Sequence, residues 1–272
     1  MPAQSRDEAV KASPRVAIDT PSLKGSINLK GGRIDDLVLA KYRDTVAANS
    51  PNVVLLSPAG TQQAYYVEQG FVGDGGKDIG APGPDTLWKA DTSGPLTQTS
   101  PITLSYDNGK GLVFTRTISI DDNYMFTVTD GVANSGSSEV TLDPYGVVYR
   151  QGLPHSQAYY ILHEGLIGVL EDGSLEQLTY KKALDHPPST FKSNSGWLGI
   201  TDKYWAATIV PEQGKAFNAT FTGSTGAAPG AEWFKADYVM APLSVAPGGK
   251  AETRSYIFAG AKEVHLIDAY QE

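Results

Sequence analysis

Apolar and polar residues alternate with a period of two along most of the chain, the pattern of β-strands with one buried face. The clearest case runs from residue 102 to residue 128 in three stretches. The apolar residues that share a face within these stretches are Ile102, Leu104, Tyr106, Leu112, Phe114, Ile118, Ile120, Tyr124, Phe126 and Val128. Between the first two stretches, Asn108-Gly109 supplies residues that tolerate the positive φ angles of a tight hairpin turn. We therefore expect an antiparallel hairpin that continues into a third strand.

The stretch GWLGITDKYWAATIVP, residues 196 to 211, places two tryptophans around a predicted turn, Asp202-Lys203. Both faces of the strand after this turn are largely apolar, which is typical of a covered strand inside a sheet. Aromatic side chains bury large areas and dominate cores. We therefore expect Trp197 and Trp205 to be core residues. The alternative is an aromatic platform on which a ligand stacks.

Short strand patterns recur along the chain, with turns between them that draw on 29 glycines and 17 prolines. Many strands at short spacing predict an all-β fold, a large antiparallel β-sandwich formed by residues 16–260. Residues 1–15 are polar and are expected to form a linker. The stretch 151–195 is less regular, so we expect loops and short strands there.

Only residues 261–272 change to a helical period. In AKEVHLIDAYQE, Val264, Ile267 and Tyr270 recur at a spacing of three, and Leu266 lies at the edge of the same face. A helix of about 10 residues is marginal alone in water, so it needs an apolar face docked on something. These four residues are therefore a candidate interaction surface that packs against the sandwich. The alternative is the fraying that is common at chain ends.

The charge of the chain narrows its possible partners. The formal net charge is −8 and the pI is near 5.0. Such a surface repels phosphate backbones, so we expect no nucleic-acid partner.

No apolar run approaches the roughly 20 residues that span a bilayer, so we expect no membrane span in this chain. The absence of cysteine excludes a disulfide framework, a thiolate metal site and a Cys nucleophile.

Residues that could carry out chemistry are scattered along the sequence. The four histidines, His155, His163, His186 and His265, lack the spacing of a metal site, and no G-x-S-x-G motif is present. We therefore expect no catalytic residue, no metal and no cofactor. The enzymatic alternative is a sugar-active protein such as a mutarotase, in which a His acid and a carboxylate base converge on a sugar ring. Glu164 or Asp185 would then supply the carboxylate.

Arg116 is an exception to the hairpin pattern, because it falls on the apolar face of its strand. A buried arginine must be paired or must extend its charged end to water. Arg116 is therefore a candidate cleft residue that binds a carboxylate or a sugar. The alternative is an ion pair with an internal Asp or Glu.

Three segments of the chain together resemble one known family. They are TPSLKGSINLKGGRIDDL, FTRTISIDDNYMFTV and GWLGITDKYWAATIVP. They resemble the large periplasmic domain of YidC-type membrane protein insertases of Gram-negative bacteria, and the similarity extends over roughly residues 14–272. The resemblance implies a β-supersandwich similar to galactose mutarotases, with helix at its C-terminal end.

The resemblance also implies a place and a role. The family's domain lies on the periplasmic side of the bacterial inner membrane, between the first two transmembrane helices of a multi-pass protein. That protein inserts and folds membrane proteins, alone or with the Sec translocon, and its insertase chemistry resides in the membrane part. We therefore interpret the chain as a non-enzymatic docking or chaperone-like module. Its expected partners, through the full-length protein, are Sec translocon components and membrane protein substrates; the alternative is a mutarotase-like sugar-binding protein or enzyme.

Overall fold

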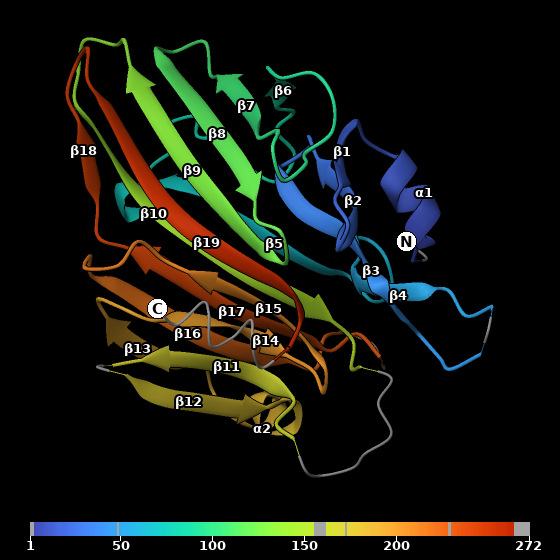
Figure 1. Cartoon of the computed structure of the whole chain (residues 1–272). Coiled ribbons are helices and arrows are strands. Elements are labelled where there is room, and N and C mark those ends of the chain that lie inside the picture. The colour runs from blue at the N-terminus through green and yellow to red at the C-terminus, as the bar shows by residue number, and fades with distance from the viewer. Residues whose placement is uncertain (1–2, 48, 155–161, 172, 228–229, 264–272) are drawn as a thin grey trace.

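The computed structural model describes residues 3–47, 49–154, 162–171, 173–227 and 230–263, and most of them form two antiparallel sheets (Figure 1). The strands of the ten-stranded sheet are β1 (Arg15–Asp19), β2 (Leu23–Asn28), β3 (Arg33–Arg43), β4 (Asn52–Leu56), β5 (Tyr65–Gly73), β10 (Val140–Gln151), β13 (Ser189–Ser193), β16 (Phe217–Ser224), β17 (Trp233–Met240) and β18 (Leu243–Val245). Their order is β1-β2-β3-β5-β10-β17-β16-β13, with β4 paired to β3 and β18 paired to β10.

The second sheet has nine strands. They are β6 (Lys89–Ala90), β7 (Ile102–Asp107), β8 (Leu112–Ile120), β9 (Met125–Asn134), β11 (Gly165–Leu170), β12 (Ser174–Thr179), β14 (Trp197–Thr201), β15 (Trp205–Val210) and β19 (Lys250–Ala261). Their order is β12-β11-β14-β15-β19-β9-β8-β7-β6. The described helices are α1 (Arg6–Lys11), the 3₁₀ turn η1 (Asp74–Gly76) and α2 (Tyr180–Asp185).

The core lies between the two sheets, where β10 and β17 of one contact β14 and β15 of the other. Phe221 and Phe234 from the ten-stranded sheet and Leu198 and Ile200 from the nine-stranded sheet are almost completely buried. The close approach of the sheets requires glycine at one position. A Cβ atom on Gly146 would lie 2.5 Å from the Tyr238 ring and 3.0 Å from Ile209 Cδ1. The prediction of a large antiparallel all-β sandwich is confirmed.

The predicted hairpin is β7 and β8, which continue into β9, but its turn differs from the expected one. The connection covers four residues, and the positive φ angles belong to Gly109 (67°) and Gly111 (94°). Asn108 acts through its side chain instead. Its Oδ1 accepts from the backbone N–H groups of Lys110 (2.8 Å) and Leu112 (3.1 Å). The turn is therefore held by a side-chain acceptor as well as by glycine conformation.

Two short helices lie where strands, loops or a linker were expected. In the stretch 151–195, α2 begins after Thr179, whose hydroxyl caps the Lys182 N–H at 3.3 Å. Within residues 1–15, Ser5 and Glu8 form a reciprocal capping box at the start of α1. Helices of six residues contain fewer than two full turns, so a periodic pattern hardly distinguishes them from loops.

The end of the described chain bears on the C-terminal prediction. Strand β19 extends to Ala261, the first residue of the expected helix. The candidate interaction residues are Val264, Leu266, Ile267 and Tyr270. All four lie outside the described residues.

Candidate functional site

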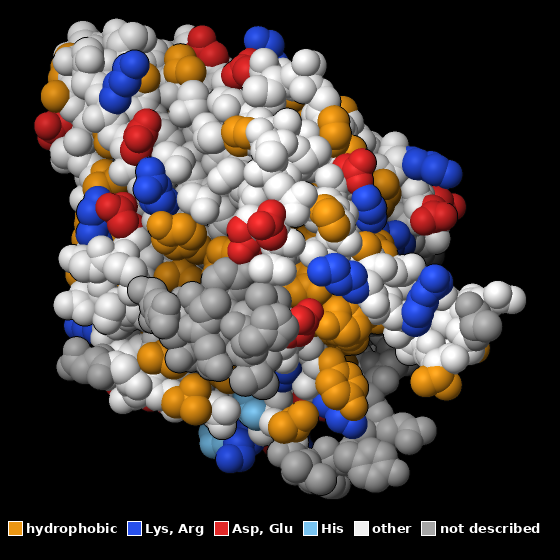
Figure 2. Space-filling view, viewed as in Figure 1, with side chains coloured by type: hydrophobic (Ala, Val, Ile, Leu, Met, Phe, Trp, Pro, Cys, Tyr) orange, Lys and Arg blue, Asp and Glu red, His pale blue; other side chains and the backbone are white. Residues whose placement is uncertain are grey.

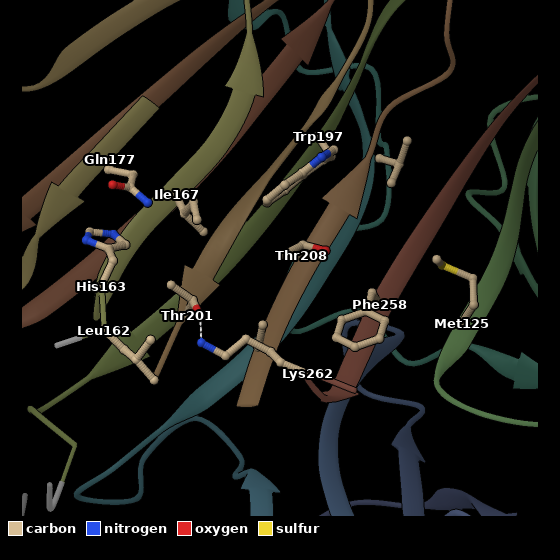
Figure 3. A pocket seen from close by; sticks show the side chains of 12 residues that line it. Met125, Leu162, His163, Ile167, Gln177, Trp197, Thr201, Thr208, Phe258 and Lys262 are labelled. Atoms are coloured by element: carbon tan, nitrogen blue, oxygen red, sulfur yellow. Dashed lines mark hydrogen bonds between the residues drawn. The ribbon is translucent and has the colours of Figure 1, made fainter. Parts of the chain in front are cut away.

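A cavity of about 330 Å³ lies on the outer face of the nine-stranded sheet. It crosses β11, β14, β15, β19 and β9, and its lining includes Met125, Ile167, Trp197, Thr208, Phe258 and Lys262. We call it the sheet groove (Figure 3). Strand alternation builds it, because residues one position along each strand, such as Leu198, Ile209 and Ile257, point to the opposite face and are buried in the core.

The sheet groove is mainly apolar, with a few polar groups at one end. The Lys262 ammonium donates to Thr201 Oγ1 (2.9 Å) and to the Asp202 carbonyl (2.5 Å). His163 Nε2 donates to the Leu166 carbonyl at 2.9 Å. Burial lowers the pKa of both Lys262 and His163. A mainly apolar lining is the kind of surface on which the apolar face of an amphipathic polypeptide segment can pack.

A second cavity, of about 1080 Å³, lies at the end of the sandwich beside the β3–β4 connection and the 202–204 turn. Its lining includes Tyr42, Val54, Arg150, Asp202, Trp205 and Glu263, and we call it the end cavity. The buried Arg150 guanidinium pairs with Asp202 at 2.6 Å and lies over the Tyr65 ring at 4.9 Å. Tyr180 donates to the same carboxylate at 2.8 Å. The buried charge of Arg150 is thus paired with a carboxylate inside the cavity wall, as a buried charge requires, while its Nε has no hydrogen-bond partner among the described residues.

The chain is held tightly where it leaves β19. The Lys262 N–H donates to the Tyr204 carbonyl at 2.9 Å. The Glu263 carboxylate accepts from the hydroxyls of Tyr42 (2.7 Å) and Tyr124 (3.3 Å). Burial, together with the Glu263 carboxylate, raises the pKa of Tyr42 to about 12, so this hydroxyl remains a donor at neutral pH. We call these contacts of Lys262 and Glu263 the exit clamp.

The two tryptophans line different cavities. Trp197 is half-buried and lines the sheet groove, so the prediction that it is a core residue is wrong. Trp205 packs partly against the core, but it also lines the end cavity, where its ring meets Tyr42 edge to face at 5.1 Å. In the sequence, an apolar outer face looks the same whether another layer covers it or it lines a groove. In the structure the outer face of this strand forms the wall of the sheet groove.

Arg116, the candidate cleft residue, lies in the interior with an exposed fraction of 2%. Its Nε donates to Asp130 at 2.6 Å, and its Nη1 donates to the Gly32 carbonyl at 2.7 Å. The guanidinium also lies over the Trp88 ring. Arg116 lines neither the sheet groove nor the end cavity. The structure therefore shows the internal ion pair that was the alternative to a cleft.

The histidines and carboxylates proposed for sugar chemistry are separated. His163 lines the sheet groove, whereas Glu164 lines the end cavity and accepts from the Lys203 N–H at 3.0 Å. Asp185, the last residue of α2, and His186, which caps it, are both exposed. His155 and His265 lie outside the described residues. Within the part of the chain that the structure describes, no group of three His, Asp or Glu side chains is arranged to hold a metal ion.

Comparison with known proteins shows the family to which the chain belongs. The family model described as the YidC periplasmic domain matches residues 15–272. The chain belongs to the YidC periplasmic domain family. It is 49% identical to the membrane protein insertase YidC of Beijerinckia indica over 269 residues, which is 98% of this chain and 44% of that protein. It is 50% identical to the YidC of Methylobacterium nodulans over 279 residues, or 99% of this chain and 45% of that protein.

The chain thus spans less than half the length of the curated YidC relatives that it matches. Those relatives are named as membrane protein insertases. The described residues of this YidC periplasmic domain include no helix with the length and apolar character needed to cross a bilayer.

Solved structures show that the YidC periplasmic domain shares its fold with galactose mutarotases. A galactose mutarotase related enzyme from Lactobacillus acidophilus has a TM-score of 0.60 at 12% identity, covering 92% of this chain and 99% of that one. A putative aldose 1-epimerase from Escherichia coli K12 has a TM-score of 0.55 at 13% identity, covering 91% and 99%. At these identities the likeness concerns the fold alone. The expectation of a mutarotase-like sandwich is confirmed.

Proposed function

We propose that this domain is a docking module on the periplasmic side of the bacterial inner membrane, within an insertase that assists the insertion and folding of membrane proteins. Membership of the YidC periplasmic domain family carries the proposal. The partners, reached through the full-length protein, are membrane protein substrates and components of the Sec translocon. Figure 2 shows acidic, basic and apolar side chains interspersed over the described part of the face in view.

The module acts through the segment that follows β19. The exit clamp holds Lys262 and Glu263, and Lys262 itself lines the sheet groove, so the described part of the segment after β19 lies beside the groove. The apolar face of Val264, Ile267 and Tyr270 matches the apolar lining of the groove. We propose that this face, with Leu266 at its edge, packs in the groove as a rigid joint toward the membrane part of the protein.

The joint is tested by hydrogen exchange and by one substitution. Amides of residues 263–269 should be protected in the isolated domain, because a docked helix exchanges only on local opening. In the full-length insertase, Ile267→Asp should reduce insertion of a membrane protein substrate while the sandwich stays folded, as shown by an unchanged melting temperature of the isolated domain.

The matched control is His265→Asp, which adds a carboxylate to the same segment on the face opposite to Ile267 in a helix. It should leave insertion at the parental level. Rapid exchange throughout residues 263–269, together with normal insertion by Ile267→Asp, would rule out the joint. Co-purification of the parent full-length protein with purified Sec translocon, and its loss when residues 15–261 are deleted, tests the proposed partner.

A further inference from the structure

The segment before the sandwich is attached to it by several specific contacts. The Gln4 N–H donates to the Gly60 carbonyl at 3.0 Å, and Ala9 of α1 is buried. Arg6 pairs with Asp36, and Arg15 at the start of β1 pairs with Asp35. Figure 1 shows α1 lying beside β2 and β3. These contacts make the N-terminal segment part of the folded body.

A β-bulge in β3 places two carboxylates, Asp35 and Asp36, where they bind Arg15 and Arg6. In the pairing of β2 with β3, Ser26 is opposite Asp36 but Ile27 is opposite Ile34, so Asp35 is an extra residue. Consecutive side chains of a regular strand point to opposite faces, and a bulge interrupts this alternation. Asp35 and Asp36 are accordingly both buried and both bind arginines of the N-terminal segment.

Neighbouring polar groups hold this acidic pair in place. Ser26 donates to Asp36 Oδ2 at 2.5 Å, and Asn28 donates to Asp35 Oδ2 at 3.1 Å. Arg15 also donates through Nε to Ser26 Oγ at 2.6 Å. The side chain of Asp36 is only 7% exposed and that of Asp35 only 1%. Two buried carboxylates with prepared partners form a specific socket, in contrast to a solvated charge cluster.

The opposite end of the same strand holds the other end of the domain. Tyr42 of β3 donates to Glu263 in the exit clamp, and its ring packs against Trp205. Asp36 and Tyr42 are six residues apart, which corresponds to roughly 20 Å along an extended strand. One continuous strand therefore contacts both the segment that enters the sandwich and the segment that leaves it.

We infer that β3 is a mounting strand: its Asp35–Asp36 socket and its Tyr42 hydroxyl are positioning groups that fix the two connections between this domain and the rest of a full-length insertase at a constant separation. The inference rests on the proposed function, because it assumes attachment to the rest of the protein at both ends. A domain attached at one point can rotate about that point, whereas a domain attached at two points keeps its orientation.

The test measures how firmly each end is held. The chain contains no cysteine, so spin labels can be placed at single introduced cysteines without background labelling. One pair of labels, at the exposed Lys11 and Lys192, reports on the N-terminal segment; a second pair, at the partly exposed Lys262 and at Lys192, reports on the exit clamp and leaves the Glu263 contacts in place. In the parent domain both pairs should give narrow distance distributions in pulsed electron paramagnetic resonance.

Arg6→Gln should broaden only the first distribution, and Tyr42→Phe only the second, each by about twofold or more, as release of a local contact predicts. Both changes are at partly exposed side chains, so folding should persist, with an unchanged circular dichroism spectrum. Asp36→Asn is a second variant of the socket, and it should broaden the first distance distribution more than Arg6→Gln does. Lys24→Gln is the matched control, because the Lys24–Asp19 pair on neighbouring strands is exposed.

The outcomes separate the mounting strand from the proposed function. Broadening in the variants but not in the control supports the mounting strand; reduced insertion by the same variants in the full-length protein would support both ideas. Broader distance distributions together with normal insertion would support the mounting strand and count against the docking function. Distributions that stay narrow in Arg6→Gln, Asp36→Asn and Tyr42→Phe alike would overturn the inference, whatever the insertion assay shows.

Discussion

Arg116 and Asp130 form the centre of a buried polar network that joins the two sheets. Arg116 of β8 bonds to the carbonyls of Gly32 and Gln69, which belong to the ten-stranded sheet or its edge. The Gln69 amide donates to Asp130 at 2.9 Å and accepts from the Ser255 hydroxyl at 3.0 Å. A network in which each member has partners specifies how two layers are positioned, and it loses much when one member is removed.

Arg116→Met should therefore destabilise the domain by about 3–5 kcal/mol, because it leaves the Asp130 carboxylate buried without its cation. Chemical denaturation measures the change. Arg254→Met, at an exposed position of β19, is the control and should change stability by less than about 0.5 kcal/mol. Arg116→Met combined with Asp130→Leu should recover part of the loss. A single variant as stable as the parent would show that the pair contributes little.

Asp237 of β17 gives a prediction about pH. Burial raises the pKa of its carboxyl above 3.8, although Lys235 at 3.1 Å opposes the shift. Below pH 3.8 the group is protonated in both the folded and the unfolded state and has no effect. As pH rises, the unfolded state loses the proton first, so ionisation favours unfolding until the raised folded pKa is passed.

Asp237→Asn should consequently stabilise the domain at pH 7, and the gain should shrink as pH falls toward 3.8. Denaturant titrations of the variant and the parent between pH 3.5 and pH 7, at about 0.5-unit steps, measure this difference. Asp185→Asn, at an exposed position, is the control. A stability difference that is constant with pH, or that grows in acid, would contradict the assignment.

At the scale of elements, β19 connects the core to the exit clamp. It lies between β15 and β9, and its last residues pass directly over Tyr124. A Cβ on Gly260 would lie 2.2 Å from Tyr124 Cγ, so only glycine allows this approach. Tyr124 in turn donates to Glu263. The packing of one glycine thus positions a donor of the clamp.

Gly260→Ala should displace Tyr124 and cost about 1–3 kcal/mol, as overpacking of a filled core does. Thermal denaturation measures the cost, and hydrogen exchange at Lys262 should increase as the clamp loosens. Gly83→Ala is the control, because nothing lies within 4 Å of the added methyl group there. Equal melting temperatures for the two variants would show that Tyr124 has room to move.

At the scale of the whole molecule, the sandwich has the fold of sugar-active enzymes but a different arrangement of side chains. General acid–base catalysis needs an acid and a base within hydrogen-bond reach of one substrate. His163 faces the sheet groove and Glu164 the end cavity, and each is already bonded to a backbone group. The shared fold therefore provides the scaffold without a converging pair among these residues.

Polarimetry on freshly dissolved aldoses should accordingly show the same rate of mutarotation with this domain as in buffer alone. A mutarotase assayed in parallel shows that the measurement can detect catalysis. Acceleration by the domain that disappears in His163→Ala or in Glu164→Ala would establish an enzymatic activity and displace the docking function as the main interpretation.

The sequence by itself determined the fold class and most of the strands. Alternation at 102–128 and the turn at Asp202-Lys203 are local consequences of burying one face of a strand, so they are visible without a structure. Family membership was also recognisable from three segments. Short helices such as α1 and α2 were not, because they contain too few residues for a period to emerge.

The tertiary structure alone decided which residues form the cavities and the clamp. The sheet groove joins Met125 of β9 with Trp197 of β14 and Phe258 of β19, residues that are neighbours only because of the strand order. The same holds for Tyr42 and Glu263, which are 221 positions apart. Periodicity assigns a residue to one face of a strand, but strand order determines what that face meets. Arg116 shows the difference. The sequence predicted that its side chain lies on the buried face of the strand, whereas its pairing with Asp130 depended on the register between β8 and β9.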